Sequence, residues 1–163
     1  MKRIILAVFA LMVAAAPAWA ACTDPAEPKV NWRRCYFDSA DLTGVNLSEA
    51  ELRDTTFQRA TLKDASLSQA DAYRAKFMSA TMPGAKLDGA RLIETDFTRA
   101  DLTGASLREA DLRNAKLVGA TLKRADLTGA RLAGTDFRHA DLSGATWVDG
   151  KRICADNSIG QCN

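Results

Sequence analysis

The sequence predicts an all-β solenoid, because three features of residues 30–149 repeat together. A large apolar residue, usually Leu or Phe, recurs at every fifth position with almost no slippage. Small residues, usually Ala, stand two positions before it, and Gly often stands two positions after it. A second period of twenty residues is superimposed on the first, since nearly all the Phe residues share one register. These periods predict a chain that turns one corner per block and closes a coil every four blocks.

The five-residue period excludes the two common secondary structures. An amphipathic helix needs apolar residues three and four positions apart, and a half-buried strand needs them two apart. On a helix, a stripe of period five would move around the axis by about 140° per block and would spread over every face. A short strand followed by a corner fits the pattern, since the large residue and the Ala two positions before it then point to the same side.

The glycines indicate where the corners lie. Eight of the ten glycines stand two positions after the large residue: Gly44, Gly84, Gly89, Gly104, Gly119, Gly129, Gly134 and Gly144. A type II turn needs a positive φ at its second central residue, which Gly adopts without steric cost. Pro83 and Gly84 occupy the two central positions that such a turn prefers.

The longer period predicts a stack of aromatic rings. Outside the N-terminal segment, every Phe falls on one register spaced by twenty or its multiple, and Leu117 fills its single gap: Phe37, Phe57, Phe77, Phe97 and Phe137. Four blocks per coil would place residues twenty apart directly above one another. We therefore expect these rings on one side of the solenoid.

Blocks such as Ala40-Asp41-Leu42-Thr43-Gly44 and Ala100-Asp101-Leu102-Thr103-Gly104 resemble the pentapeptide-repeat family, whose pattern is Ala-(Asp/Asn)-Leu-X-X. The resemblance implies a right-handed quadrilateral β-helix with twenty residues per coil. Residues 30–149 hold twenty-four blocks, so about six coils are expected.

Residues 1–20 are predicted to be a signal peptide. Lys2 and Arg3 precede an apolar run, and Ala18-Trp19-Ala20 has the small-residue pattern of a cleavage site. The mature chain would begin at Ala21, and the protein would be exported to the periplasm or the extracellular space. Acylation of Cys22 is the alternative, but bacterial lipoprotein signals prefer Leu where Trp19 stands, so ordinary export is favoured.

Two irregular segments flank the repeats, namely 21–29 as an N-terminal lead-in or cap and 150–163 as a C-terminal cap. Four cysteines allow three pairings, and their spacing alone selects none. The two ends of a stack lie much further apart than the roughly 7 Å Cα separation that a disulfide permits. We therefore expect Cys22–Cys35 and Cys154–Cys162, which would seal the exposed terminal coils in an oxidising compartment. A metal site at these cysteines is disfavoured, because no other ligand residues cluster there.

The mature surface is predicted to be electrically balanced. Removal of residues 1–20 takes away Lys2 and Arg3, leaving twenty basic and twenty acidic residues. One column interleaves arginines with acids: Arg33, Arg34, Arg53, Arg74, Arg91, Arg113 and Arg131 with Glu51, Asp54, Asp71, Glu94 and Asp111. Another is the most acidic, with Glu49, Asp88, Glu109, Asp126 and Asp149 against Lys86 and Arg108. We expect ladders of exposed ion pairs, each of which stabilises little.

Enzymatic chemistry is not predicted. His139 is the sole histidine, and no combination of nucleophile, base and acid or metal-ligand spacing occurs. The many aspartates occupy the polar position of a block, which favours a structural role. Thr61, Thr81 and Thr121 share a column, but Asp41, Asp101 and Asp141 interrupt it, so a flat hydroxyl array is not sustained. No catalytic residue, metal or cofactor is therefore expected.

The sequence favours a rigid scaffold or protein-interaction module with an unidentified protein partner and no nucleic acid. Membrane attachment is expected only if Cys22 is lipidated, and the pattern does not predict the oligomeric state. The alternative also comes from the resemblance, since some pentapeptide-repeat proteins mimic DNA and bind type II topoisomerases such as gyrase. Such mimicry needs a broadly negative rod. The near-neutral charge, the predicted export and the Cys-containing ends all disfavour it.

Overall fold

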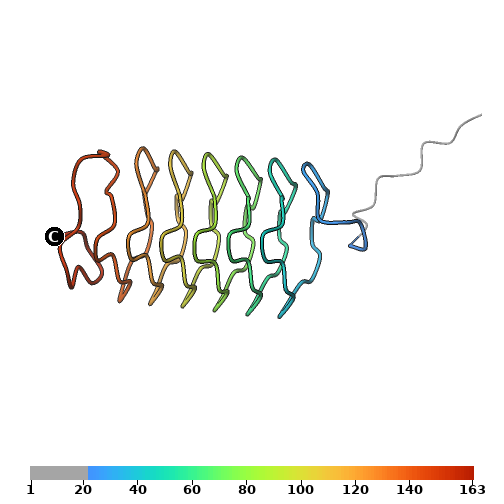
Figure 1. Cartoon of the computed structure of the whole chain (residues 1–163), viewed down its shortest axis with the longest axis horizontal. Coiled ribbons are helices and arrows are strands. Elements are labelled where there is room, and N and C mark those ends of the chain that lie inside the picture. The colour runs from blue at the N-terminus through green and yellow to red at the C-terminus, as the bar shows by residue number, and fades with distance from the viewer. Residues whose placement is uncertain (1–21) are drawn as a thin grey trace, which may run out of the picture.

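The computed structural model describes residues 22–163, which form a single row of stacked coils (Figure 1). The N-terminal coil, in blue, lies at one end of the row, and the C-terminal segment, in red, lies at the other. The predicted signal peptide lies outside the described residues. The predicted all-β solenoid is confirmed at the level of its architecture.

Parallel bridges between residues twenty apart hold the coils together. They form four ladders, named here by their first residues: Asn31, Tyr36, Asp41 and Asn46. The first bridge joins Asn31 to Glu51, and the last parallel one joins Asp126 to Thr146. Residues 22–163 contain no helix and no strand longer than a single bridging residue. The expected short strand is thus reduced to one residue per block, because the corner takes up the rest of the block.

Every block closes its corner with the same hydrogen bond. The amide of the small residue donates to the carbonyl of the large residue three positions earlier, as from Ala50 to Leu47 at 3.1 Å. From Lys29 to Gly144, the second residue between them has a positive φ, and at Pro83-Gly84 this is +69° at Gly84. Many other corners place a non-glycine residue in this conformation, including Arg59 and Arg99. Glycine therefore marks only some of the corners, and the ladder bonds hold the remainder in a conformation that L residues otherwise avoid.

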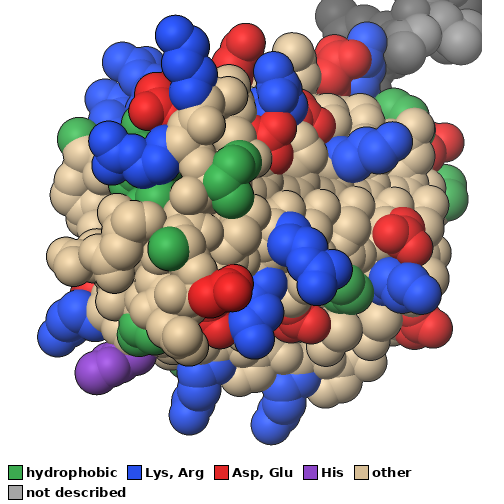
Figure 2. Space-filling view, turned by 60° about the vertical axis from the view of Figure 1, so that its left-hand side comes forward, with side chains coloured by type: hydrophobic (Ala, Val, Ile, Leu, Met, Phe, Trp, Pro, Cys, Tyr) green, Lys and Arg blue, Asp and Glu red, His purple; other side chains and the backbone are tan. Residues whose placement is uncertain are grey.

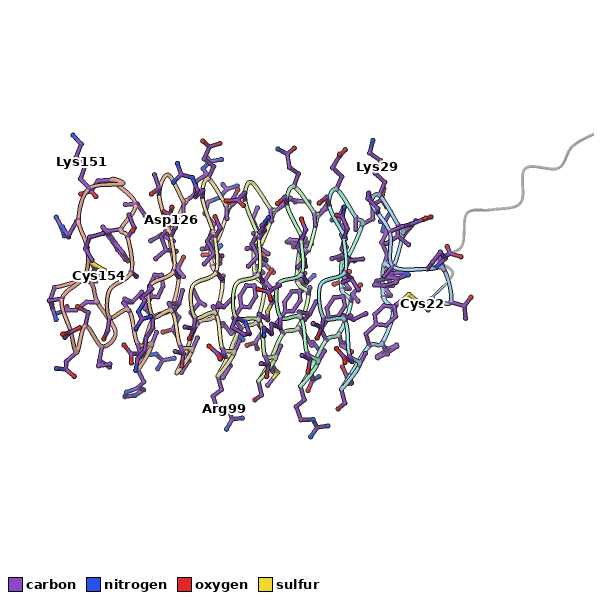
Figure 3. All side chains as sticks on the ribbon, in the orientation of Figure 1. Cys22, Lys29, Arg99, Asp126, Lys151 and Cys154 are labelled. Carbon is purple, nitrogen blue, oxygen red and sulfur yellow. A yellow bond between two sulfur atoms is a disulfide. The ribbon has the colours of Figure 1, made fainter. Side chains whose placement is uncertain are left out.

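The aromatic column forms as predicted. Phe57, Phe77 and Phe97 are fully buried and nearly parallel, with ring centroids 4.9 and 5.0 Å apart. Phe37 extends the stack at 5.5 Å from Phe57. The other columns bury mainly Leu, with Ala beside it at the small positions. Buried apolar side chains therefore fill the interior along the stack (Figure 3).

Three buried or half-buried threonines replace Ala in the aromatic register. The Thr95 hydroxyl donates to the Ala72 carbonyl at 2.8 Å, and Thr135 donates to Leu112 at the same distance. Thr55 makes the equivalent bond to Trp32. Each hydroxyl thus links its coil to the preceding one, which explains why Thr is accepted at a position that otherwise holds Ala.

Removal of one such hydroxyl should cost measurable stability. We expect Thr95→Val to lower the free energy of unfolding by about 1 kcal/mol, because the buried hydroxyl bond is lost while the volume is nearly kept. Thr81→Val is the matched control, since Thr81 is exposed on a bridge and has no side-chain hydrogen bond within residues 22–163. Urea denaturation of both variants measures the difference. Equal losses would contradict the structural role of the Thr95 hydroxyl.

The N-terminal lead-in covers the first coil. Trp32 is buried, its ring lies 4.1 Å from Phe37 between centroids, and its Nε1 donates to the Asp24 carbonyl at 3.2 Å. The backbone amide of Lys29 donates to Ser48 in the same coil. These contacts place the lead-in over the end of the aromatic column.

The C-terminal segment folds back onto the last coil in the antiparallel sense. Ile153 bridges to Thr146, and Ile159 bridges to Asp141. The amides of Leu142 and Gly144 donate to Ser158 and Cys154, respectively. Four amides earlier in the last coil have no backbone acceptor among the described residues: Leu132, Gly134, Phe137 and His139. The segment therefore makes backbone hydrogen bonds to two of the four ladders at this end and leaves the last amides of the other two without a backbone acceptor.

Candidate interaction surface

The charged side chains of the described residues lie on the outside of the stack. Each block presents its bridging residue and its two corner residues to solvent, while the large and small residues point inward. Figure 2 shows basic and acidic side chains interspersed over the face in view. The candidate functional site is therefore a surface rather than a cleft.

The Asn31 ladder carries a network of ion pairs. Asp71 contacts Arg91 at 3.0 Å and Arg53 at 4.0 Å, so one carboxylate lies between two arginines. Similar pairs occur in the neighbouring coils: Arg33–Glu51, Arg74–Glu94, Arg113–Asp111 and Arg131–Asp111. The predicted ladder of exposed pairs is confirmed for this column.

The ring of Tyr73 lies at the centre of this network, which sequence reasoning missed. The guanidinium carbons of Arg53, Arg74 and Arg91 lie 5.2, 5.6 and 5.0 Å from its centroid. Cations at this distance from an aromatic ring are attracted to it. The register of the repeats could have indicated this contact, since Tyr73 lies twenty residues after Arg53 and beside Arg74.

Aspartates on the bridges stabilise the corners that follow them. The Asp41 carboxylate accepts the amide of Thr43 at 3.0 Å and its hydroxyl at 2.6 Å. Asp141 accepts the same two groups from Ser143. These bonds lower the pKa of both aspartates below the ordinary value, and the bond from the hydroxyl is the largest cause in each case. The pKa of Asp111 is lowered chiefly by its hydrogen bonds from Arg113. The structural role expected of these carboxylates agrees with their contacts.

These lowered pKa values predict a loss of stability in acid. A carboxylate with a lower pKa in the folded state stabilises the fold above its unfolded pKa of about 4, and loses that effect as the pH falls through the folded value. We expect a level melting temperature between about pH 7 and 5 and a decline below about pH 4. Circular dichroism melts across this range test it. Asp141→Asn should reduce the decline more than Asp156→Asn, whose carboxylate makes no hydrogen bond in residues 22–163, and a decline centred above pH 5 would contradict the assignment.

A shallow hollow opens on the Asn46 ladder. It has a volume of about 520 Å³. Its lining is polar and contains both signs of charge: Ser68, Gln69, Lys86, Asp88, Gly89, Ser106, Arg108 and Glu109. Arg108 is held in an ion pair with Asp126 at 2.8 Å, and Ser106 donates to Asp88. Two of the polar groups in the hollow thus pair with each other, and a third pairs with a carboxylate beside it.

Each end of the stack brings two cysteines together. The sulfur atoms of Cys22 and Cys35 are 2.02 Å apart, and those of Cys154 and Cys162 are 2.03 Å apart. The Cα separations are 5.5 and 4.9 Å, within the range of a disulfide. Both pairs are the ones expected from the sequence, and no described cysteine lies outside them.

The described residues offer no cluster of side chains suited to a metal ion. Across residues 22–163, no three His, Cys, Asp or Glu side chains are placed to hold one metal ion. His139 is exposed on a corner, at a φ of +60°. In the same range, no helix is long and apolar enough to span a bilayer.

The fold and the surface define a class, namely repeat solenoids that bury an apolar interior and display ladders of polar side chains. The model of pentapeptide repeats matches eight copies, over residues 29–59, 57–92, 75–114 and 105–144. The chain therefore belongs to the pentapeptide-repeat family, as its sequence indicated. A comparison with curated protein sequences found no significant match.

Several solved structures are similar to the chain. HetL, a protein from Nostoc sp. strain PCC 7120 involved in heterocyst differentiation regulation, is 32% identical with a TM-score of 0.48. The match covers 76% of this chain and 68% of HetL. A pentapeptide repeat protein from the Arabidopsis thaliana thylakoid lumen is 24% identical with a TM-score of 0.42, covering 78% and 83% of the two chains. The plasmid-mediated fluoroquinolone resistance protein QnrB1 is 22% identical with a TM-score of 0.35, covering 74% and 70%.

Proposed function

We propose that the protein is an exported, non-enzymatic scaffold or protein-interaction module of the periplasm or the extracellular space. The observation that carries this proposal is the pairing of all four cysteines at the two ends of the stack. Disulfides persist in oxidising compartments and are rare in the cytosol of mesophiles. The pairing agrees with the leader pattern of residues 1–20, from which export was first inferred.

The proposed domain organisation follows the same observations. A signal peptide of residues 1–20 precedes a lead-in of 21–29, a repeat region of 30–149 and a cap of 150–163. We infer that the repeat region is a right-handed, four-sided helix of about six coils. The four bridge ladders and their twenty-residue interval support this geometry.

The interaction role rests on the rigidity and the polarity of the outer surface. Backbone bonds join successive coils at every block, so the side chains on one ladder keep a constant spacing. The interior is filled by buried apolar side chains, so the polar groups of the repeats lie mainly on the outer surface. Proteins that contact long, regular surfaces of this kind are the expected partners.

Mass spectrometry of the protein purified from its native host tests the compartment. Cells are lysed in the presence of a thiol-alkylating reagent, without reductant. We expect a chain that begins at Ala21, carries no lipid and has four cysteines protected from alkylation. A cytoplasmic chain that retains Met1 and is alkylated at all four cysteines would overturn the proposal, and an acyl group on Cys22 would replace free export with membrane anchoring.

The partner is sought by capture from envelope extract. A bait with the folded repeats is compared with a bait in which four paired arginines of the Asn31 ladder are replaced by Gln: Arg33, Arg53, Arg91 and Arg131. A protein retained by the first bait and lost from the second supports the interaction role. Inhibition of purified gyrase by the protein would instead favour the DNA-mimic alternative.

A further inference from the structure

The Tyr36 ladder carries four cations that make no ion pair among the described residues. Its four middle blocks are residues 55–59, 75–79, 95–99 and 115–119. They contain four exposed basic residues, namely Arg59, Lys76, Arg99 and Lys116, which we call the basic strip. Within residues 22–163, none of the four makes an ion pair or a side-chain hydrogen bond. The carboxylate of these blocks is Asp96, so their formal net charge is +3.

The neighbouring Asn31 ladder has a different arrangement of charges. It carries seven arginines, and six of them contact a carboxylate within 4.0 Å. Both ladders belong to the same solenoid with the same coil spacing. Asp96 bridges to both Lys76 and Lys116, but its Oδ1 accepts the Thr98 amide at 2.9 Å. Asp136, which bridges to Lys116, pairs with Arg138 at 2.7 Å. The cations of the basic strip are therefore left without an ion pair.

The four cations follow a regular zigzag along the stack. Arg59 and Arg99 occupy the second corner position of their blocks, while Lys76 and Lys116 occupy the bridging position. Successive coils thus contribute one cation each, at an axial interval of about 4.8 Å. Arg99 projects away from the stack on its lower side in Figure 3. This spacing presents a row of positive charge to any extended ligand that lies along the axis.

Hydroxyl and apolar groups flank this row. Thr61, Thr81 and Thr121 follow on the Asp41 ladder, just past the corner that holds Arg59 and Arg99. Asp101 interrupts these threonines, and its Oδ1 is held by the amide and hydroxyl of Thr103 at 3.0 and 2.6 Å. Met78 and Val118 lie half-buried within the strip, on the same blocks as the two lysines. The middle of the strip contains no exposed aromatic ring on which a nucleic-acid base could stack. The groups present suit a ligand that combines regularly spaced negative charges with hydroxyls and ring C–H groups.

We propose that the basic strip binds an extended polysaccharide of acidic sugars. The carboxylates of the polysaccharide pair with the lysine ammonium and arginine guanidinium groups of the strip through charge-assisted hydrogen bonds. The threonine hydroxyls bond to the sugar hydroxyls, and the Met78 and Val118 side chains pack against the ring faces. This binding goes beyond the proposed scaffold role and does not depend on the compartment in which the protein works.

Fluorescence anisotropy with labelled oligogalacturonate tests the proposal on the purified, disulfide-intact protein. We expect binding at about 50 mM salt. The affinity should fall as salt is added, because the release of counterions then favours binding less. The variant with Gln at Arg59, Lys76, Arg99 and Lys116 should bind at least about tenfold more weakly, and its log–log salt slope should be smaller by about 3. All four side chains are exposed, and Gln69 already occupies the corner conformation of Arg59 and Arg99.

The matched control replaces Arg33, Arg53, Arg91 and Arg131 with Gln, which changes the net charge equally on the ladder of ion pairs. We expect its affinity to stay within about threefold of the parent, since separated surface charges are screened by salt. Melting curves verify that both variants are folded. An equal loss in the control, or no binding of oligogalacturonate at 50 mM salt, would overturn the proposal. Tighter binding of single-stranded DNA of equal charge would overturn the choice of a polysaccharide.

Discussion

Phe77→Ala should lower the free energy of unfolding by about 3–5 kcal/mol, the range for a large aromatic removed from a packed core. Phe77 is fully buried, and its ring lies 4.9 Å from Phe57 and 5.0 Å from Phe97 between centroids. The substitution removes both stacking contacts and leaves a cavity between coils. Backbone hydrogen bonds on either side limit the collapse of that cavity. The Phe77 amide donates to the Asp96 carbonyl at 2.7 Å, and the Lys76 amide donates to the Thr55 carbonyl at 2.9 Å.

The aromatic column contains its own control for this prediction. Phe37 has the same register but is half-buried, with a ring neighbour from one adjacent coil and Trp32 on its other side. Phe37→Ala should therefore cost less, about 1–3 kcal/mol, in proportion to the smaller area that it buries. Urea denaturation followed by circular dichroism compares the two variants. Equal losses at both positions would contradict a stability that depends on coverage by both neighbouring coils.

Cys154→Ser combined with Cys162→Ser should destabilise the C-terminal end by about 2–3 kcal/mol, as expected for a disulfide that closes a short loop. The loop spans a sequence separation of 8 residues and holds the segment that bonds to Leu142 and Gly144. Detachment of this segment would expose the last edge on all four ladders. Such an edge pairs readily with other chains. We therefore expect faster hydrogen exchange at Leu142 and Gly144 and a shift to concentration-dependent oligomers.

Hydrogen exchange by mass spectrometry and size-exclusion chromatography with light scattering measure these two effects. Cys22→Ser combined with Cys35→Ser is the matched control at the other end, where exchange should increase near Trp32 and remain unchanged near Leu142. Unaltered exchange at Leu142 in the C-terminal variant would show that the backbone bonds hold the segment without the disulfide. Increases at both ends in both variants would indicate global unfolding rather than local fraying.

The residue pattern predicted the features that depend on register alone. Two nested periods placed Phe57, Phe77 and Phe97 on one side, and the structure stacks them there. The interleaved arginines and acids of the Asn31 ladder predicted ion pairs in the same way. Register suffices in these cases because coils of constant length bring residues twenty apart into contact whatever their local conformation.

Other features depend on interactions that no short stretch of sequence contains. Arg59 and Arg99 adopt a positive φ without being glycine, because hydrogen bonds to the next coil hold them in it. The position of Tyr73 beneath three guanidinium groups depends on the direction of side chains from three different blocks. Sequence spacing gives the column of each residue but not the direction of its side chain.

The sequence by itself therefore determined the solenoid, its aromatic column and the grouping of charged residues into columns. Tertiary structure alone decided which cations are neutralised and which, like Lys76 and Lys116, remain unpaired. It also decided that residues 150–163 make backbone hydrogen bonds to only part of the last coil, leaving the amides of Leu132 and Phe137 without a backbone acceptor among the described residues. The physical reason is that a repeat sets the separation of residues along the stack, whereas ion pairs and edge pairing need atoms within a few ångströms, and only the folded chain determines those distances.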